Sequence, residues 1–151
     1  MLVLLSAIVI VGIVGMRHMQ NTGEHILPDR IQKIRLVQSM GVAARERTVL
    51  LQRMLLVEDP FERDLLSVDF NIQGARFAQA RIALLEKELS EPEKALLERQ
   101  SRSSGASART QNDVVDLIAV DDIKNAKALL TQKAMPAQDE VLAVLSELMK
   151  Y

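Results

Sequence analysis

The chain has 151 residues, of which 48% are hydrophobic and 26% are charged, and its net charge is −1. This composition fits one folded domain and argues against a nucleic-acid-binding protein, which needs a clustered excess of Lys and Arg. The absence of cysteine excludes disulfides, thiolate chemistry and cysteine-based zinc sites. Aromatic residues are only 3% of the chain, so we expect an aliphatic core of the kind found in helical bundles.

An apolar run without charged residues opens the chain at residues 2–16. As a helix, residues 1–16 would span about 24 Å, which is shorter than the roughly 30 Å hydrocarbon core of a bilayer. A cleaved signal peptide is the alternative, although no basic segment precedes the run and no A-x-A-like site follows it. We predict a transmembrane helix at 1–16 that is truncated at its start, then a membrane-proximal helical connector at 17–28. Flanking charge does not set its orientation, because Arg17 follows the run and no Lys or Arg precedes it.

Start and stop signals divide the remaining domain, 29–151, into four segments. The sequence Asp59-Pro60-Phe61-Glu62 combines an N-cap, a proline in the first turn and an acidic residue, and Ser90-Glu91-Pro92-Glu93 repeats this pattern. Asp121-Asp122 provides a third cap. These signals predict helices at 29–57, 61–89, 92–119 and 123–150. Equal lengths and short connections predict an all-α fold, an antiparallel up-down-up-down four-helix bundle.

Heptad spacing predicts which residues face the core of this bundle. The first helix offers Ile34, Val37, Gly41, Ala44, Thr48, Leu51 and Leu55. The second offers Phe61, Leu65, Val68, Ile72, Ala75, Gln79, Ile82 and Leu89. The third is the weakest, because Gln100, Ser104, Ser107 and Gln111 occupy its seam, and the fourth is interrupted at Pro136.

The first helix carries a second apolar stripe outside its predicted core seam. A helix that is apolar on two faces buries both, so we predict a parallel homodimer through this membrane-linked helix. The alternative is a wide core-facing arc in an imperfect bundle. The candidate interface residues are Leu36, Val42, Val49, Leu50 and Leu56.

The sequence contains no catalytic constellation, and we predict no enzyme activity, no cofactor and no metal site. His18 and His25 are the only histidines, and no acidic cluster lies near them in the sequence. The acidic residues at the helix starts already have a capping role. No glycine-rich phosphate loop is present.

Arginines are the best candidates for ligand-binding residues in this sequence. The candidate ligand-binding residues are Arg45, Arg47 and Arg53 on the first helix, and Arg76 and Arg81 lie on the second. One interpretation is a solvated helix face paired with nearby acids. The other is a carboxylate-recognising patch at the dimer seam, where guanidinium groups form bidentate contacts.

A second candidate site follows from counting inward from the end-turns of the helices. Gly41, Gly74, Gly105 and Pro136 then fall at one height, beside the polar stretch 101–107. Glycine and proline inside helices weaken packing, so we predict a mid-bundle hinge or pocket, with a tolerated packing defect as the alternative.

The order of these features resembles a known family, the four-helix-bundle periplasmic sensory module of bacterial methyl-accepting chemotaxis receptors and related membrane-bound kinases and diguanylate cyclases. The likeness rests on the segment 45–63, RERTVLLQRMLLVEDPFER, and on the segment 121–130, DDIKNAKALL. The resemblance implies an extracytoplasmic sensor domain that works as a parallel homodimer at the bacterial inner membrane, with the bundle in the periplasm.

The resemblance also implies a mechanism and partners. The last helix would pass small shifts to a cytoplasmic output module beyond Tyr151, in response to a small carboxylate ligand or a periplasmic partner protein. No nucleic acid is expected. The alternative is a membrane-tethered helical binding or stress-chaperone module without an output domain. Ligand identity and the type of output stay open at this point.

Overall fold

A computed structural model describes residues 29–151 of the chain. The chain divides into two compact units, Met1–Lys33 and Ile34–Tyr151, and the second holds the bundle. The predicted transmembrane helix at 1–16 and the connector at 17–28 lie outside the described residues. Among the residues that are described, no helix is long and apolar enough to cross a membrane.

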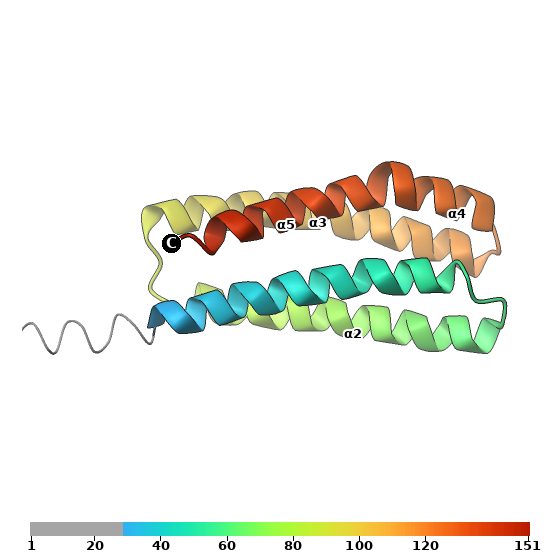
Figure 1. Cartoon of the computed structure of the whole chain (residues 1–151), viewed down its shortest axis with the longest axis horizontal. Coiled ribbons are helices and arrows are strands. Elements are labelled where there is room, and N and C mark those ends of the chain that lie inside the picture. The colour runs from blue at the N-terminus through green and yellow to red at the C-terminus, as the bar shows by residue number, and fades with distance from the viewer. Residues whose placement is uncertain (1–28) are drawn as a thin grey trace, which may run out of the picture. The chain divides into compact units, whose positions relative to one another are not determined.

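The described part of the chain is helical and contains no strand. The first helix is described over 29–54, and it is followed by α2 (Pro60–Leu85) and α3 (Glu91–Ala119). The last helix has three parts in direct succession, α4 (Ile123–Leu129), η1 (Leu130–Ala134) and α5 (Met135–Leu148). Successive helices run in opposite directions within the unit Ile34–Tyr151 (Figure 1). The predicted four-helix bundle is confirmed, and its helices begin and end within a few residues of the predicted positions.

The predicted caps explain where the helices begin. The Asp59 side chain accepts a hydrogen bond from the Phe61 backbone N–H at 2.9 Å, ahead of Pro60. The Glu93 carboxylate accepts one from the Ser90 backbone N–H at 2.7 Å. Asp122 caps α4 by accepting from the Asn125 N–H. Each contact satisfies a backbone donor that a helix start leaves unpaired.

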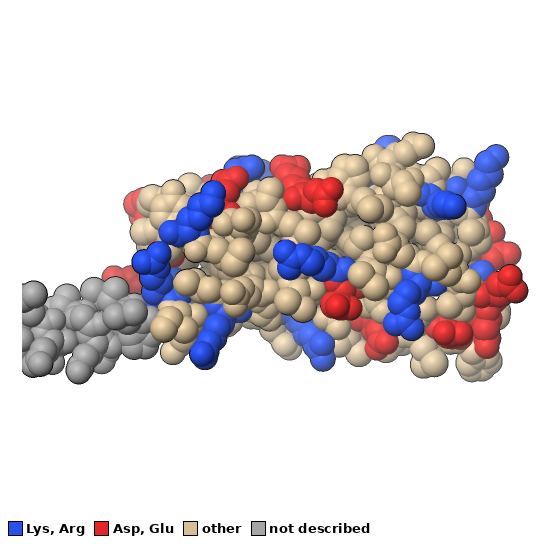
Figure 2. Space-filling model, in the orientation of Figure 1, with Lys and Arg blue, Asp and Glu red and all other residues tan. Residues whose placement is uncertain are grey.

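One end of the bundle is held together by Arg63. Its Nη1 lies 2.9 Å from Asp121 Oδ1 in the α3–α4 turn, and its Nε donates to the Val57 carbonyl at 2.6 Å. Asp121 has a positive φ of 59°, which a short polar side chain tolerates better than most. Acidic side chains gather at this end (Figure 2). The arginine therefore joins the connection that follows the first helix to the α3–α4 turn, which lies 58 residues after Arg63 in the chain.

The last helix continues through Pro136, which corrects the predicted interruption there. Instead, η1 is a π-helical turn that ends two residues before the proline, closed by a bond from the Met135 N–H to the Leu130 carbonyl. Proline lacks an N–H and its ring crowds the carbonyl four residues earlier. The wider turn absorbs this conflict, and the helix continues to Leu148.

The core consists of two apolar clusters drawn from all four helices. One contains Leu50, Leu51, Met54, Leu66, Phe70, Val114, Ile118, Ala126, Leu130 and Ala134. The other contains Val37, Met40, Ala80, Leu84, Leu97, Val141, Leu145 and Leu148. Between them along the helices lie buried polar residues, which separate the core into two halves.

The predicted core seam of α2 is wrong. Phe61, Leu65, Val68, Ile72 and Ile82 are all exposed, and Phe61 is 82% exposed. The buried residues of α2 are Leu66, Phe70, Ala80 and Leu84. The helix is apolar on two faces, and heptad spacing alone does not tell which face meets the core. The exposed residues, which we call the outer α2 stripe, are left facing solvent in the bundle.

Candidate ligand pocket in the bundle core

Polar side chains from α3 and α5 fill the layer between the two apolar clusters. Gln100, Ser103, Ser107 and Gln111 of α3 are buried, as is Gln138 of α5. A buried amide or hydroxyl costs free energy unless it is hydrogen-bonded, so such a layer is unfavourable for stability alone. The amide nitrogens of Gln100 and Gln138 have no hydrogen-bond partner. The α3 residues of this layer lie in the polar seam and the polar stretch 101–107 predicted from sequence, whereas Gln138 was not among the predicted residues.

A chain of hydrogen bonds crosses the bundle through this layer. Arg47 Nε of the first helix donates to Gln111 Oε1 at 2.9 Å. Gln111 Nε2 donates to Gln138 Oε1 at 3.1 Å, and Ser107 Oγ donates to the same oxygen at 3.3 Å. We call Arg47, Gln111 and Gln138 the polar relay. It links the first helix to the last helix, four residues beyond η1.

The Arg47 guanidinium is partly withdrawn from water and has no acidic partner. Its carbon lies 3.8 Å from the centre of the Phe70 ring, which is a cation–π contact. Burial lowers the pKa of Arg47 to about 10. The side chain is still a cation at neutral pH, and no carboxylate among the described residues forms an ion pair with it.

Arg81 of α2 is arranged in the same way. Its Nε donates to Gln100 Oε1 at 2.9 Å, again a neutral amide of α3. No ion pair involves Arg81 within the described part of the chain. Two guanidinium groups from neighbouring helices are thus held by neutral amide side chains, Arg47 by Gln111 and also by Asn112 at 3.5 Å, and neither has an ion-pair partner among the described residues.

Both arginines line one pocket of about 450 Å³. Gly74, Phe77 and Ile82 of α2, Gly105 of α3 and Gln138 of α5 are also part of its wall. The pocket opens between α2 and α3, since Ala78, Ile82 and Ser101 in its wall are exposed. No acidic side chain lines it, so its wall carries two positive charges and an otherwise apolar and hydroxyl-rich surface.

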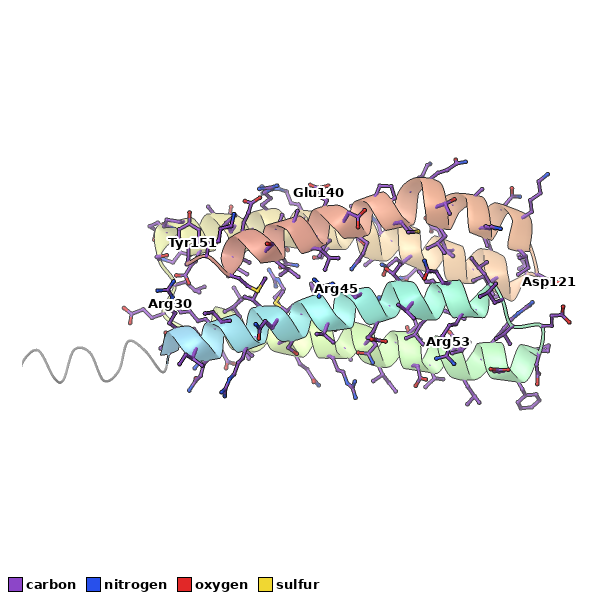
Figure 3. The ribbon with its side chains drawn as sticks, viewed as in Figure 1. Arg30, Arg45, Arg53, Asp121, Glu140 and Tyr151 are labelled. Carbon is purple, nitrogen blue, oxygen red and sulfur yellow. The ribbon has the colours of Figure 1, made fainter. Side chains whose placement is uncertain are left out.

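The structure separates the predicted site residues. Arg47 lines the pocket, whereas Arg45 and Arg53 have exposed side chains and are not part of its wall (Figure 3). Gly74 and Gly105 share the pocket, whereas Gly41 and Pro136 are not part of its wall. Arg81 was noted on the second helix without being chosen as a candidate. A pocket therefore lies at the predicted height in the middle of the bundle, but only some of the predicted residues form its wall.

Some of the predicted interface residues of the first helix are buried in the bundle and others are exposed. Leu50 is buried in the first apolar cluster and Leu36 packs against the second, so both serve the core and Leu50 is not available to a partner. The core-facing arc of this helix includes Leu36 and Leu50 and is wider than a strict seam. Val42, Val49 and Leu56 are exposed.

The two glycines in the pocket wall are expected to respond differently to alanine. A Cβ on Gly105 would meet no atom within 4 Å, so Gly105→Ala should stabilise the bundle by about 0.5–1 kcal/mol through helix propensity. A Cβ on Gly74 would overlap the Arg47 guanidinium. Gly74→Ala should therefore be about 1–2 kcal/mol less stable than Gly105→Ala, because Arg47 loses Phe70 and Gln111.

Urea unfolding curves with unchanged slope would measure this difference. Gly41→Ala is a suitable reference, since its Cβ would lie at an ordinary 3.5 Å from Arg45 Nη1. Equal gains in the free energy of unfolding for Gly74→Ala and Gly105→Ala would contradict the position of the Arg47 side chain described above.

A polar layer, an internal pocket and a relay between the first and last helices define a class of protein, the four-helix bundle with a pocket in its core. Comparison with protein families identifies it further. The model of the family described as four helix bundle sensory module for signal transduction matches residues 1–151, so the chain belongs to this family. Neither a curated protein nor a solved structure matches the chain.

Proposed function

We propose that the chain is the extracytoplasmic sensor domain of a transmembrane signalling receptor, of the chemotaxis type or linked to a kinase or cyclase. Family membership and the four-helix bundle support a role in signal transduction. The apolar run at 2–16 supports a membrane anchor, and the resemblance to chemotaxis receptors supports a position of the bundle in the periplasm of a bacterial inner membrane.

The observation that carries this proposal is the polar relay. It ties the helix that follows the anchor to the helix that would return to the membrane, through bonds of 2.9 Å and 3.1 Å. Binding in the pocket competes for these bonds and so favours one packing of the last helix over another. The π-turn beside the relay is a place where that helix can adjust.

The test is signalling output of the complete receptor in its native membrane. Gln138→Leu cuts the relay at the last helix and should fix the output at one level, irrespective of stimulus. Glu140→Gln, two residues away and exposed, should leave the response unchanged. A normal stimulus response in Gln138→Leu would contradict the role of the relay.

We further propose that the receptor acts as a parallel homodimer through exposed apolar residues of the first helix and α2. Large exposed apolar side chains are concentrated here, at Val42 and Val49 of the first helix, at Leu56 in the turn that follows it and along the outer α2 stripe. Exposed apolar side chains gathered on an element are typical of contact sites.

Acidic substitutions on these helices are expected to weaken the dimer. Val49→Glu and Leu65→Glu should each raise the dissociation constant at least tenfold in sedimentation experiments, without loss of helix content. Ala143→Glu on the exposed side of α5 is the matched control and should have no effect. Sedimentation as a monomer at every concentration of the unaltered full chain would contradict the dimer.

A membrane-tethered binding module without output is the second candidate. It also needs the pocket, but it does not need the relay to reach the last helix. The Gln138→Leu experiment separates the two, because a tether without output gives no signal to change.

A further inference from the structure

The polar relay fixes the direction in which its amide groups point. An arginine side chain has only hydrogen-bond donors, so Gln111 must turn its oxygen to Arg47 Nε and its NH₂ group to Gln138. The Gln138 oxygen then accepts from Gln111 Nε2 at 3.1 Å and from Ser107 Oγ at 3.3 Å. The relay therefore uses the oxygen of Gln138 and leaves its NH₂ group over.

No residue in the described part of the chain satisfies this NH₂ group. Gln138 is only 5% exposed and is part of the pocket wall, and its Nε2 has no hydrogen-bond partner. Buried side-chain donors in folded proteins are normally satisfied. An acceptor oxygen bound in the pocket would satisfy this one.

The cations of the pocket wall are already held by other partners. Arg47 donates to Gln111, and Arg81 donates to Gln100. The two glutamines are eleven residues apart on α3, which is about 16 Å along the helix axis. The guanidinium groups are thus bound at separate places, and the unsatisfied group of the wall is the neutral donor of Gln138.

The rest of the wall favours a ligand body without N–H or O–H donors. Phe77, Ile82 and Val141 give an apolar surface. The amide oxygens of Gln111 and Gln138 already accept hydrogen bonds, so a donor on the ligand would compete with the relay. A pocket of about 450 Å³ has room for a small molecule. A ketone or an ester meets these conditions, because it combines an acceptor oxygen with an apolar body.

We propose that the pocket binds a small neutral carbonyl compound, a ketone or an ester, whose oxygen accepts a hydrogen bond from Gln138 Nε2. Its apolar body lies against Phe77 of α2 and Val141 of α5. The inference deepens the proposed function and rests on it only for its consequence. That consequence is a contact between the ligand and the amide group with which the polar relay ends on the last helix.

Two probes of similar shape test the hydrogen bond on the full chain in detergent. Acetophenone has a carbonyl oxygen where α-methylstyrene has a CH₂ group, and NMR titration gives the dissociation constant of each. We define the ketone preference as the dissociation constant of α-methylstyrene divided by that of acetophenone. Partition of the probes into micelles is the same for every variant, so it cancels when variants are compared.

Gln138→Glu is the variant that removes the donor alone. It keeps the oxygen that accepts from Gln111 and Ser107, and measurement at about pH 8 keeps the new carboxyl group ionised. The ketone preference should fall at least about tenfold, because the ligand oxygen loses its donor. An unchanged ketone preference would overturn the proposal.

Gln100→Glu is the matched control. Gln100 is also buried with an unpaired Nε2, but it is not part of the wall of this pocket. Its substitution should leave the ketone preference unchanged, and an equal fall would overturn the assignment to Gln138. Benzoate should bind no more tightly than acetophenone, after correction for partition into empty micelles. Tighter binding of benzoate would also overturn the proposal, because charge would then select the ligand.

Gly105→Leu tests the position of the site without changing Gln138. A Cβ at Gly105 would meet no atom within 4 Å, so the larger side chain enters the open space of the pocket. Acetophenone should bind at least about tenfold more weakly, since the pocket is filled. Circular dichroism melting checks that each variant folds. Unchanged binding of acetophenone in a folded Gly105→Leu variant would overturn the proposal even if Gln138→Glu does not fold.

The outcomes separate this inference from the proposed function. If acetophenone binds as expected but does not change the output of the complete receptor, the link between pocket and output fails and the site stands. If the output responds to a stimulus and Gln138→Glu leaves the ketone preference unchanged, the site fails and the sensor role stands.

Discussion

Replacing Phe70 by alanine is expected to destabilise the bundle by about 3–5 kcal/mol, the cost of deleting a large buried aromatic side chain. Phe70 is 1% exposed and lies in the apolar cluster that joins all four helices. It also supports the Arg47 guanidinium, so its loss removes the cation–π contact together with the packing. Thermal and urea unfolding of the full chain would measure the change.

Phe61 gives a matched control on the same helix. It is the same residue type but is 82% exposed, so Phe61→Ala should change the free energy of unfolding by no more than about 0.5 kcal/mol. A dimer that covers the outer α2 stripe would make the Phe61 effect depend on protein concentration. A large effect of Phe61→Ala at all concentrations, with a small one for Phe70→Ala, would mean that α2 is turned the other way.

Two single-residue deletions in the last helix are expected to have very different effects on the stability of the bundle. A π-turn holds one residue more than an α-turn, so deleting Gln132 from η1 should close it to a regular turn and keep the faces of α4 and α5 in register. The comparison uses Pro136→Ala as the parent, because the proline would clash in a regular turn. The Gln132 deletion should retain a cooperative unfolding transition close to that of the parent.

Deleting Asp139 from α5 in the same parent has the opposite expectation. Each residue of an α-helix turns the chain by about 100°, so the deletion rotates Val141, Leu145 and Leu148 out of the core. We expect the free energy of unfolding to fall by more than about 5 kcal/mol, because several large core side chains are lost at once. No cooperative unfolding transition should then remain. Two deletions with similar unfolding curves would contradict the description of η1.

Helix positions could be predicted because their signals are local. Asp59, Ser90 and Asp122 form their hydrogen bonds with residues two or three positions away, so the sequence contains both partners of each contact. The polar seam of α3 was also visible, because Gln100, Ser107 and Gln111 recur at the spacing of one helix face.

The face of α2 could not be chosen from spacing. Phe61, Leu65, Val68 and Ile72 follow a heptad as well as Leu66, Phe70, Phe77 and Leu84 do. The choice depends on what the other helices present, since Phe70 packs with residues as distant as Leu51 and Val114. Tertiary packing decides such cases, and the sequence of one helix does not contain it.

The pocket could be predicted in height but not in its residues. Arg45, Arg47 and Arg53 are equivalent in sequence, and only the packing of α2 and α3 buries Arg47 against Phe70 and Gln111. Gln138 was missed because its partners lie 27 and 31 residues earlier, on another helix. The one signal available in the sequence was a glutamine at position 138, within an otherwise apolar seam of the last helix.

The central claim is that the polar relay sets the position of the last helix, and an interspin distance tests it directly. The 151 residues contain no cysteine, so Arg53→Cys and Glu140→Cys, both exposed, give a clean pair of spin labels on the first and last helices (Figure 3). Arg47→Gln should shift the mean distance by about 1–2 Å, the scale of helix movements in such switches, although Arg47 does not bond to the last helix. Arg45→Gln should leave the distance unchanged, and an unchanged distance in Arg47→Gln would contradict the account.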